Sequence, residues 1–167
     1  MEEYEKLTLL QNTLKYIVDL LREDDRISIV RFSTKATRVT PLQRVTSSNK
    51  PAIKRAINNI KTGGSTNITA GMAQALKILN ERKYRNPVSS VFLLSDGLDD
   101  EDAISGVRRL LDTQKPKDNF TINSFGYGSD HDPVLMTSIA QLMDGKFYFV
   151  EKLETVDECF VHAIGGL

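Results

Sequence analysis

The sequence predicts an α/β domain in which a mostly parallel, doubly wound sheet is covered by helices on both faces, giving three layers. Two observations support this fold class. Val91–Leu94 form a short, continuous apolar run, which is typical of a strand buried on both faces. Along the rest of the chain, segments with strand character alternate with segments of helical periodicity, and this alternation favours parallel strands with right-handed crossovers. The length of 167 residues suits a single domain with a substantial core.

The first part of the chain predicts a helix, two strands and a second helix. Apolar residues recur at spacings of three and four over residues 7–21, which indicates an amphipathic helix. Arg26–Phe32 is rich in β-branched residues and predicts a strand. Ala36–Pro41 predicts a short strand at a sheet edge, because proline cannot donate to a ladder. Ser48–Ile60 predicts a helix with Pro51 in its first turn.

The alternation continues to the C-terminus. The expected elements are helices at 70–82, 103–112 and from Pro133, strands at 88–94, 120–125 and 146–150, and a last helix lined by Val156, Cys159, Phe160, Ala163 and Ile164. Gly126-Tyr127-Gly128 is interpreted as a turn. A domain of this kind normally begins with a strand, whereas this sequence begins in a predicted helix.

Composition narrows the classes of partner. Lys plus Arg and Asp plus Glu number 22 each, so no charge excess favours nucleic acid or anionic lipid. The single cysteine, Cys159, excludes an internal disulfide and a zinc site built from cysteines. No apolar run reaches membrane-spanning length, and MEEYEK is not a secretory signal. We therefore expect a cytoplasmic protein with no nucleic-acid partner and no membrane insertion.

Two polar turns carry the chemistry. The buried strand ends at Ser95-Asp96-Gly97, and ligands of parallel α/β sheets bind at such carboxyl ends. Gly63-Gly64-Ser65-Thr66-Asn67 leads into a predicted helix. Thr66 and Asp96 are hard oxygen donors expected at the same sheet edge, and such donors suit Mg²⁺ or Ca²⁺. Residues 99–102 are acidic and are interpreted as capping the helix that follows them.

Several segments together resemble one family. RISIVRFS, GGSTNITAGMAQAL, VFLLSDG, FGYGSDHDP and ECFVHAIGGL are similar, in this order, to the von Willebrand factor A (VWA) domain, and the likeness covers residues 1–167 as a single domain. The last two segments look most like the branch found in plant and protist multidomain proteins, some of which carry a RING zinc finger. In this family a metal-ion-dependent adhesion site (MIDAS) holds Mg²⁺.

The resemblance implies a role for each matching residue. Thr66 and Asp96 would be the loop and turn ligands of the metal, and the supporting loop residues would be Gly63, Gly64, Ser65, Asn67, Ser95 and Gly97. The family's other motif, Asp-x-Ser-x-Ser after the first strand, occurs nowhere in the sequence. The metal site is therefore expected to be a remnant, weak or lost, with no cofactor bound by this chain although intact relatives bind Mg²⁺.

The missing motif also implies a missing strand. The domain is expected to be incomplete at its N-terminus and to lack the central first strand, which in the family lies between the strands that are here Arg26–Phe32 and Val88–Leu94. These two strands should then be either separated by a slot or newly paired. An open edge on each of them would be available for pairing with another chain.

The leading functional hypothesis is a non-enzymatic protein-interaction module. Its unknown protein partner is expected on the face that carries Ser33–Lys35, Gly63–Asn67 and Gly97–Asp100. One alternative is a doubly wound hydrolase or phosphotransferase with Asp96 as nucleophile, although no lysine lies near Asp96 in sequence to handle phosphate. Another alternative is a gene-model fragment without independent function. No Ser-His-Asp, Cys-His or paired-carboxylate pattern points to catalysis.

Three minor candidates have simpler interpretations. Asp130-His131-Asp132 could form a metal trio, but Asp132-Pro133 is typical of a helix start. His162 is expected on the surface of the last helix. Cys159 lies on the apolar stripe of that helix and is expected to behave as a small hydrophobic residue.

Overall fold

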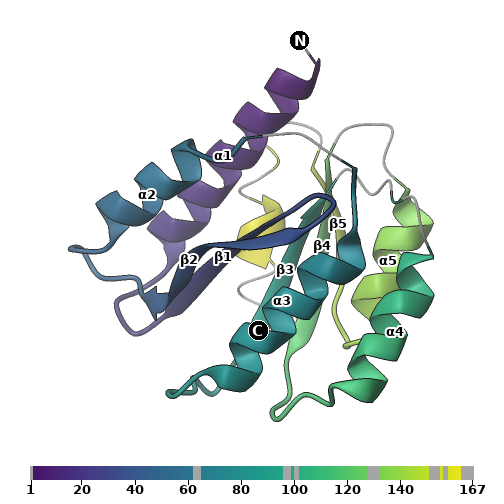
Figure 1. The fold of residues 1–167 in the computed structure, drawn as a ribbon. Helices are drawn as coiled ribbons and strands as arrows, with labels where there is room; N and C mark the ends of the chain where they lie inside the picture. Colours follow the sequence, from purple (N-terminus) through teal and green to yellow (C-terminus); the bar gives the residue numbers. More distant parts are fainter. Residues whose placement is uncertain are drawn as a thin grey trace.

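In the computed structural model the chain forms an α/β fold with helices on both sides of the strands (Figure 1). The structure describes residues 2–61, 65–95, 99, 102–127, 132–150, 155 and 158–162. Its elements are, in order, α1 (Glu2–Leu20), β1 (Arg26–Phe32), β2 (Ala36–Arg44), α2 (Lys50–Asn58), α3 (Ile68–Glu81), β3 (Ser90–Ser95), α4 (Ala103–Thr113), β4 (Thr121–Tyr127), α5 (Pro133–Gln141) and β5 (Phe147–Val150).

The described strands form two sheets. β3, β4 and β5 make a parallel sheet in that order, with Ser90 opposite Thr121 and Ser124 opposite Phe147. β1 and β2 make a separate antiparallel hairpin. β1 therefore does not pair with β3, so of the two arrangements expected for these strands the structure has the separated one.

The hairpin strand β2 is longer than expected. It was predicted to stop at Pro41 but continues to Arg44, because a bulge accommodates the proline. Ile27 pairs with Gln43 and Ile29 pairs with Thr40, so one residue of β1 faces two of β2 at Pro41. The backbone N–H of Ile29 donates to the Thr40 hydroxyl oxygen at 2.9 Å instead of to a backbone carbonyl.

β4 corrects another expectation. Gly126 and Tyr127 were interpreted as a turn but are the last two residues of this strand. Gly126 pairs with Ser95 on one side and with Phe149 on the other. All residues of β4 after Thr121 are buried. Hydrogen bonding on both edges and burial on both faces thus outweigh the turn preference of glycine.

The apolar cores lie on opposite faces of the strands. On one face α3, α4 and α5 pack against β3 and β4 through Met72, Leu76, Leu93, Val107, Leu110, Ile122, Met136 and Ile139. On the other face α1 and the 158–162 segment pack against the same strands through Ile17, Phe125, Tyr127, Val150 and Phe160. The Phe125 and Phe160 rings stack with centroids 4.1 Å apart. The layers are thus helix, sheet and helix.

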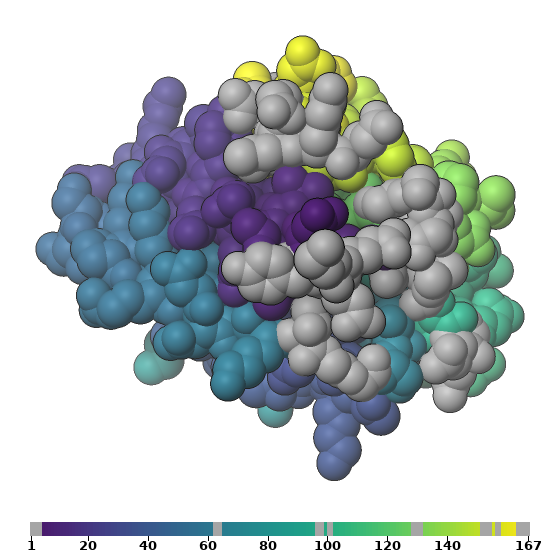
Figure 2. Space-filling view, turned by 90° about the horizontal axis from the view of Figure 1, so that it is seen from above, coloured from purple at the N-terminus to yellow at the C-terminus, as the bar shows by residue number. Residues whose placement is uncertain are grey.

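A third cluster attaches the hairpin. It joins α1, β1 and α2 through Val18, Ile29, Val45, Ile53 and Ile57. Figure 2 shows α1 between the α2 region and the C-terminal part of the chain on one face of the molecule. The hairpin also contacts α3, because the Phe32 ring of β1 packs against Gly71. A Cβ added to Gly71 would lie 2.8 Å from a carbon of this ring. No helix among the described residues has the length and apolar character needed to cross a bilayer.

The turn between α5 and β5 generates a stability prediction. A Cβ on Gly145 would lie 1.6 Å from the backbone carbonyl oxygen of Ile122, which is fully buried in β4. We expect Gly145→Ala to lower the free energy of unfolding by about 3 kcal/mol or more, because neither backbone can move without breaking the ladder. Urea denaturation followed by circular dichroism measures this change.

Gly106→Ala is the matched control. Its Cβ would also be crowded, at 2.4 Å from the Thr69 hydroxyl oxygen, but a side chain can rotate away. Alanine also gains about 1 kcal/mol over glycine inside a helix. A loss for Gly106→Ala equal to that of Gly145→Ala would contradict the backbone explanation.

Candidate functional site

The loops at one end of the strands are tied together by hydrogen bonds. The carbonyl oxygen of Ser33, just after β1, accepts from the backbone N–H of Asn67 at 2.9 Å. The hydroxyl oxygens of Thr34 and Ser65 lie 3.1 Å apart. The loop after β1 is therefore held against the loop that precedes α3, and hydroxyl side chains gather at this edge.

The N-terminus of α3 is capped by two side chains. Asn67 is the N-cap, and its side-chain oxygen accepts from the backbone N–H of Ala70 at 3.0 Å. The carboxylate of Asp99 accepts from the backbone N–H of Ile68 at 2.9 Å. A negative charge at this place also interacts favourably with the helix dipole. The segment after β3 is thus attached to α3.

This arrangement corrects the interpretation of Asp99, which was expected to cap the helix that follows it. That role belongs to Asp102, which accepts from the backbone N–H of Ser105 at 3.1 Å and from its hydroxyl at 2.7 Å. These two hydrogen bonds hold the pKa of Asp102 below its usual value, and the bond from the Ser105 hydroxyl makes the larger contribution. Asp100 and Glu101 lie outside the described residues.

The predicted site residues are only partly described. Thr66 is half-buried in the loop before α3, and Ser95 is half-buried at the end of β3. Both line the cavity that separates β1 from β3. Ser65 is exposed and Asn67 is half-buried. Asp96, Gly97, Gly63 and Gly64 lie outside the described residues, so the pairing of Thr66 with Asp96 stays a prediction.

The described donors at this edge do not by themselves fit a divalent cation. Thr66 and Ser95 offer neutral hydroxyls, and the Asp99 carboxylate already accepts from Ile68. Within the described ranges no three His, Cys, Asp or Glu side chains are placed to hold a metal ion. Mg²⁺ prefers about six oxygen ligands, with carboxylates among the protein donors. We therefore derive no chemistry through a metal.

The minor candidates have structural roles. Asp132 is the N-cap of α5 and accepts from the backbone N–H of Leu135 at 3.0 Å, which confirms the helix-start interpretation for this residue. Asp130 and His131 are not among the described residues. His162 is exposed, as predicted, and its Nδ1 lies 3.0 Å from the Tyr148 hydroxyl.

Cys159 is half-buried and packs in the cluster of Phe125 and Phe160, as expected for a small hydrophobic residue. Burial raises the pKa of its thiol. The thiol is therefore a poor nucleophile at neutral pH.

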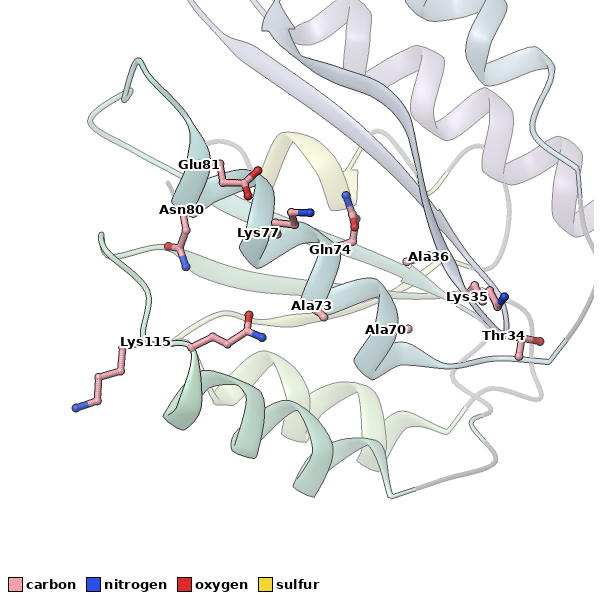
Figure 3. A pocket seen from close by; sticks show the side chains of 11 residues that line it. Thr34, Lys35, Ala36, Ala70, Ala73, Gln74, Lys77, Asn80, Glu81 and Lys115 are labelled. Atoms are coloured by element: carbon pink, nitrogen blue, oxygen red, sulfur yellow. The ribbon is translucent and has the colours of Figure 1, made fainter.

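A surface depression of about 740 Å³ lies beside α3, between the turn of the hairpin and the segment after α4. Figure 3 shows Lys35 at one end of it and Lys115 at the other, with Gln74 and Lys77 of α3 between them. The charged groups do not converge on a common point. The depression has no arrangement suited to catalysis.

The comparison with known proteins identifies the family. Residues 2–161 match the von Willebrand factor type A domain. The chain belongs to this family. The solved structure of a von Willebrand factor type A protein from Catenulispora acidiphila superimposes with a TM-score of 0.80 at 22% identity, over 92% of this chain and 36% of that one. This likeness confirms the fold.

The likeness to the plant branch is also confirmed. The "Probable E3 ubiquitin-protein ligase WAVH2" of Arabidopsis thaliana is 34% identical over 103 residues, which is 59% of this chain and 14% of the relative's length. This VWA domain therefore corresponds to a small part of that relative.

One structural relative carries a metal. The proximal thread matrix protein 1 from the mussel byssus, described with a zinc occupied MIDAS motif, has a TM-score of 0.71 at 19% identity, over 98% of this chain and 43% of that one. At this identity the likeness concerns the fold alone.

The cap of α3 generates a second prediction. Asn67→Ala should lower the free energy of unfolding by about 1 kcal/mol, because the N–H of Ala70 loses its acceptor. Asn67→Asp is the control, since aspartate also accepts this bond and adds a favourable charge at the helix N-terminus. Thermal or urea denaturation compares the two variants, and an equal loss for both would contradict the capping role.

Proposed function

We propose that this VWA domain is a non-enzymatic protein-interaction module. The observation that carries the proposal is the family match over residues 2–161, because VWA domains typically serve in protein binding. The state of the cysteine and of His162 also supports a non-enzymatic role. In the part of the chain that the structure describes, the one cysteine is a half-buried thiol of raised pKa, and His162 has a tyrosine hydroxyl as its partner.

We place the binding face at the edge where the loops gather. Thr34, Lys35 and Ser65 are exposed there, and the Thr34 and Ser65 hydroxyls are within hydrogen-bonding distance of each other. The attachment of Asn67 to Ser33 gives this face a fixed backbone. Hydroxyl groups beside a lysine suit an acidic or polar segment of a protein partner.

Charge reversal tests this location. Lys35→Glu should weaken capture of specific partners from a lysate of the protein's own organism by about tenfold, since an acidic partner would meet a like charge. Lys15→Glu on α1 is the matched control and should leave capture unchanged. Quantitative mass spectrometry of both eluates is the measurement. Equal loss with the two variants, or loss with Lys15→Glu alone, would place the binding face elsewhere.

Thr66 and Asp96 are proposed as a remnant metal site that is weak or lost. The described part of the chain offers no carboxylate cluster to complete it. We expect calorimetric titration with Mg²⁺ or Mn²⁺ to show no specific binding at about 1 mM or below, the weak end of protein cation sites. A single tight site that disappears in Asp96→Ala would overturn this proposal while leaving protein binding at the same face open.

A further inference from the structure

The depression beside α3 has a local excess of positive charge. Three lysines line it: Lys35 in the turn between β1 and β2, Lys77 of α3 and Lys115 in the segment after α4. Among its lining residues in the described part of the chain, Glu81 alone is acidic. The whole chain has equal numbers of basic and acidic residues, 22 of each, so this excess belongs to the depression and not to the surface in general.

The three lysines are available to a ligand. All of them are exposed, and within the described ranges none of them takes part in an ion pair. Other basic residues of the chain do have such partners, since Lys54 lies 2.6 Å from Asp19 and Arg82 lies 3.2 Å from Asp118. An acidic ligand in the depression would therefore not have to displace a carboxylate of this chain.

The lysines are spread along the length of the depression. Lys35 lies at one end and Lys115 at the other, with Lys77 between them (Figure 3). The lined part of α3 runs from Ala70 to Glu81, which corresponds to about 17 Å of helix. A small anion would meet one lysine at most. An extended peptide rises about 3.3 Å per residue, so five or six residues would pass all three.

The rest of the lining suits a peptide backbone. Its apolar part consists of Ala36, Ala70 and Ala73, which are half-buried and whose short side chains let a bound chain lie close to α3. Gln74 and Gln114 also line the depression, and a side-chain amide both donates to a carbonyl oxygen and accepts from an N–H.

The walls of the depression are held in place by contacts within the chain. The Ser33 carbonyl oxygen accepts from the Asn67 N–H at 2.9 Å, which fixes the hairpin turn against the start of α3. At the other end the Asn80 side-chain oxygen accepts from the Lys117 N–H at 3.1 Å. A groove whose walls are already positioned loses little conformational freedom when it binds a ligand.

We propose that this depression binds an extended acidic segment of a protein partner, with carboxylates at alternate positions facing Lys35, Lys77 and Lys115. Alternate side chains of an extended chain point to the same side about 7 Å apart, so one row of carboxylates can face all three lysines. Such a ligand is part of a protein, so this inference rests on the proposed function. It extends the binding face from Lys35 along α3.

Other polyanions match the lining less well. No arginine and no aromatic residue line the depression, whereas single-stranded nucleic acid is typically held by stacking on aromatic rings. Juxtamembrane segments that bind anionic lipid carry about four to eight basic residues, more than the three found here. A concave surface also makes poor contact with a flat bilayer. The observations thus favour a peptide.

The probe is a fluorescein-labelled peptide of about eight residues in which glutamate and serine alternate. We expect its fluorescence anisotropy to saturate when it is titrated with the 167-residue chain at low salt. The control peptide has glutamine in place of each glutamate and should bind at least about tenfold more weakly. Equal affinity of the two peptides would overturn the proposal. Displacement by single-stranded DNA or anionic vesicles at lower concentrations than by unlabelled peptide would also overturn it.

Charge reversal locates the bound peptide. Lys77→Glu and Lys115→Glu should each weaken binding about fivefold, because a carboxylate of the peptide then meets a like charge. Lys146→Glu is the matched control, since Lys146 is exposed, lies outside the depression and gives the same change of net charge. An equal effect of all three variants would show attraction to the overall charge and would refute a site along α3.

A pair of neutral variants tests the shape of the site. Gln74→Phe places a ring in the depression without changing its charge and should weaken binding at least about fivefold. Gln141→Phe places the same ring on the exposed end of α5 and should leave binding unchanged. Unchanged binding by Gln74→Phe would mean that the peptide lies outside the depression.

The same variants separate this site from the binding face at the loops. Lys115 is remote from that face, so Lys115→Glu tests the depression alone, whereas Lys35→Glu affects both. Weaker partner capture by Lys35→Glu with unchanged peptide binding by Lys77→Glu and Lys115→Glu would overturn the acidic groove and leave the proposed function intact. Weaker peptide binding by these two variants with unchanged capture by Lys35→Glu would support the groove and overturn the binding face at the loops.

Discussion

The packing of α1 against both sheets is the interaction on which the rest of the fold depends. Its neighbouring residues Ile17 and Val18 belong to different cores: Ile17 packs with Phe125 of the parallel sheet, and Val18 packs with Ile29 of the hairpin. Because no backbone ladder joins β1 to β3, side-chain burial along helices must hold the two sheets together. On the other face α3 makes a second connection through Phe32 and Met72. The buried side chains of these two helices therefore set the spacing of the sheets.

Elements whose bounds depend on neighbouring residues in the chain could be predicted from the sequence. Arg26–Phe32 has the bounds predicted from its β-branched residues, and Asp132 before Pro133 forms the predicted helix start. The longer reach of β2 and β4 was not predictable in this way. Pro41 and Gly126 have turn-like preferences, and only the pairing of their strands, with β1 for Pro41 and with β3 and β5 for Gly126, shows why both lie inside strands.

The candidate site itself stays a prediction. The glycine-rich loop and the end of the buried strand singled out Thr66 and Ser95, and both line the cavity between β1 and β3. The role of Asp99 could not be inferred, because its partner Ile68 is 31 positions away and nothing near Asp99 in sequence indicates it. The sequence does not distinguish among several acidic residues that precede a helix, since each of them could be its N-cap. Tertiary contacts determine which helix each of these residues caps.

The division of the strands into two sheets has a consequence for cooperativity. β4 is bonded on both edges and buried on both faces, whereas β1 has one bonded edge and the helices as its main support. A segment held mainly by side chains can detach without breaking the parallel ladder. We therefore expect the hairpin with α2 to open as a separate foldon, at lower free energy than β3–β5, to which α1 and α3 are its main connections.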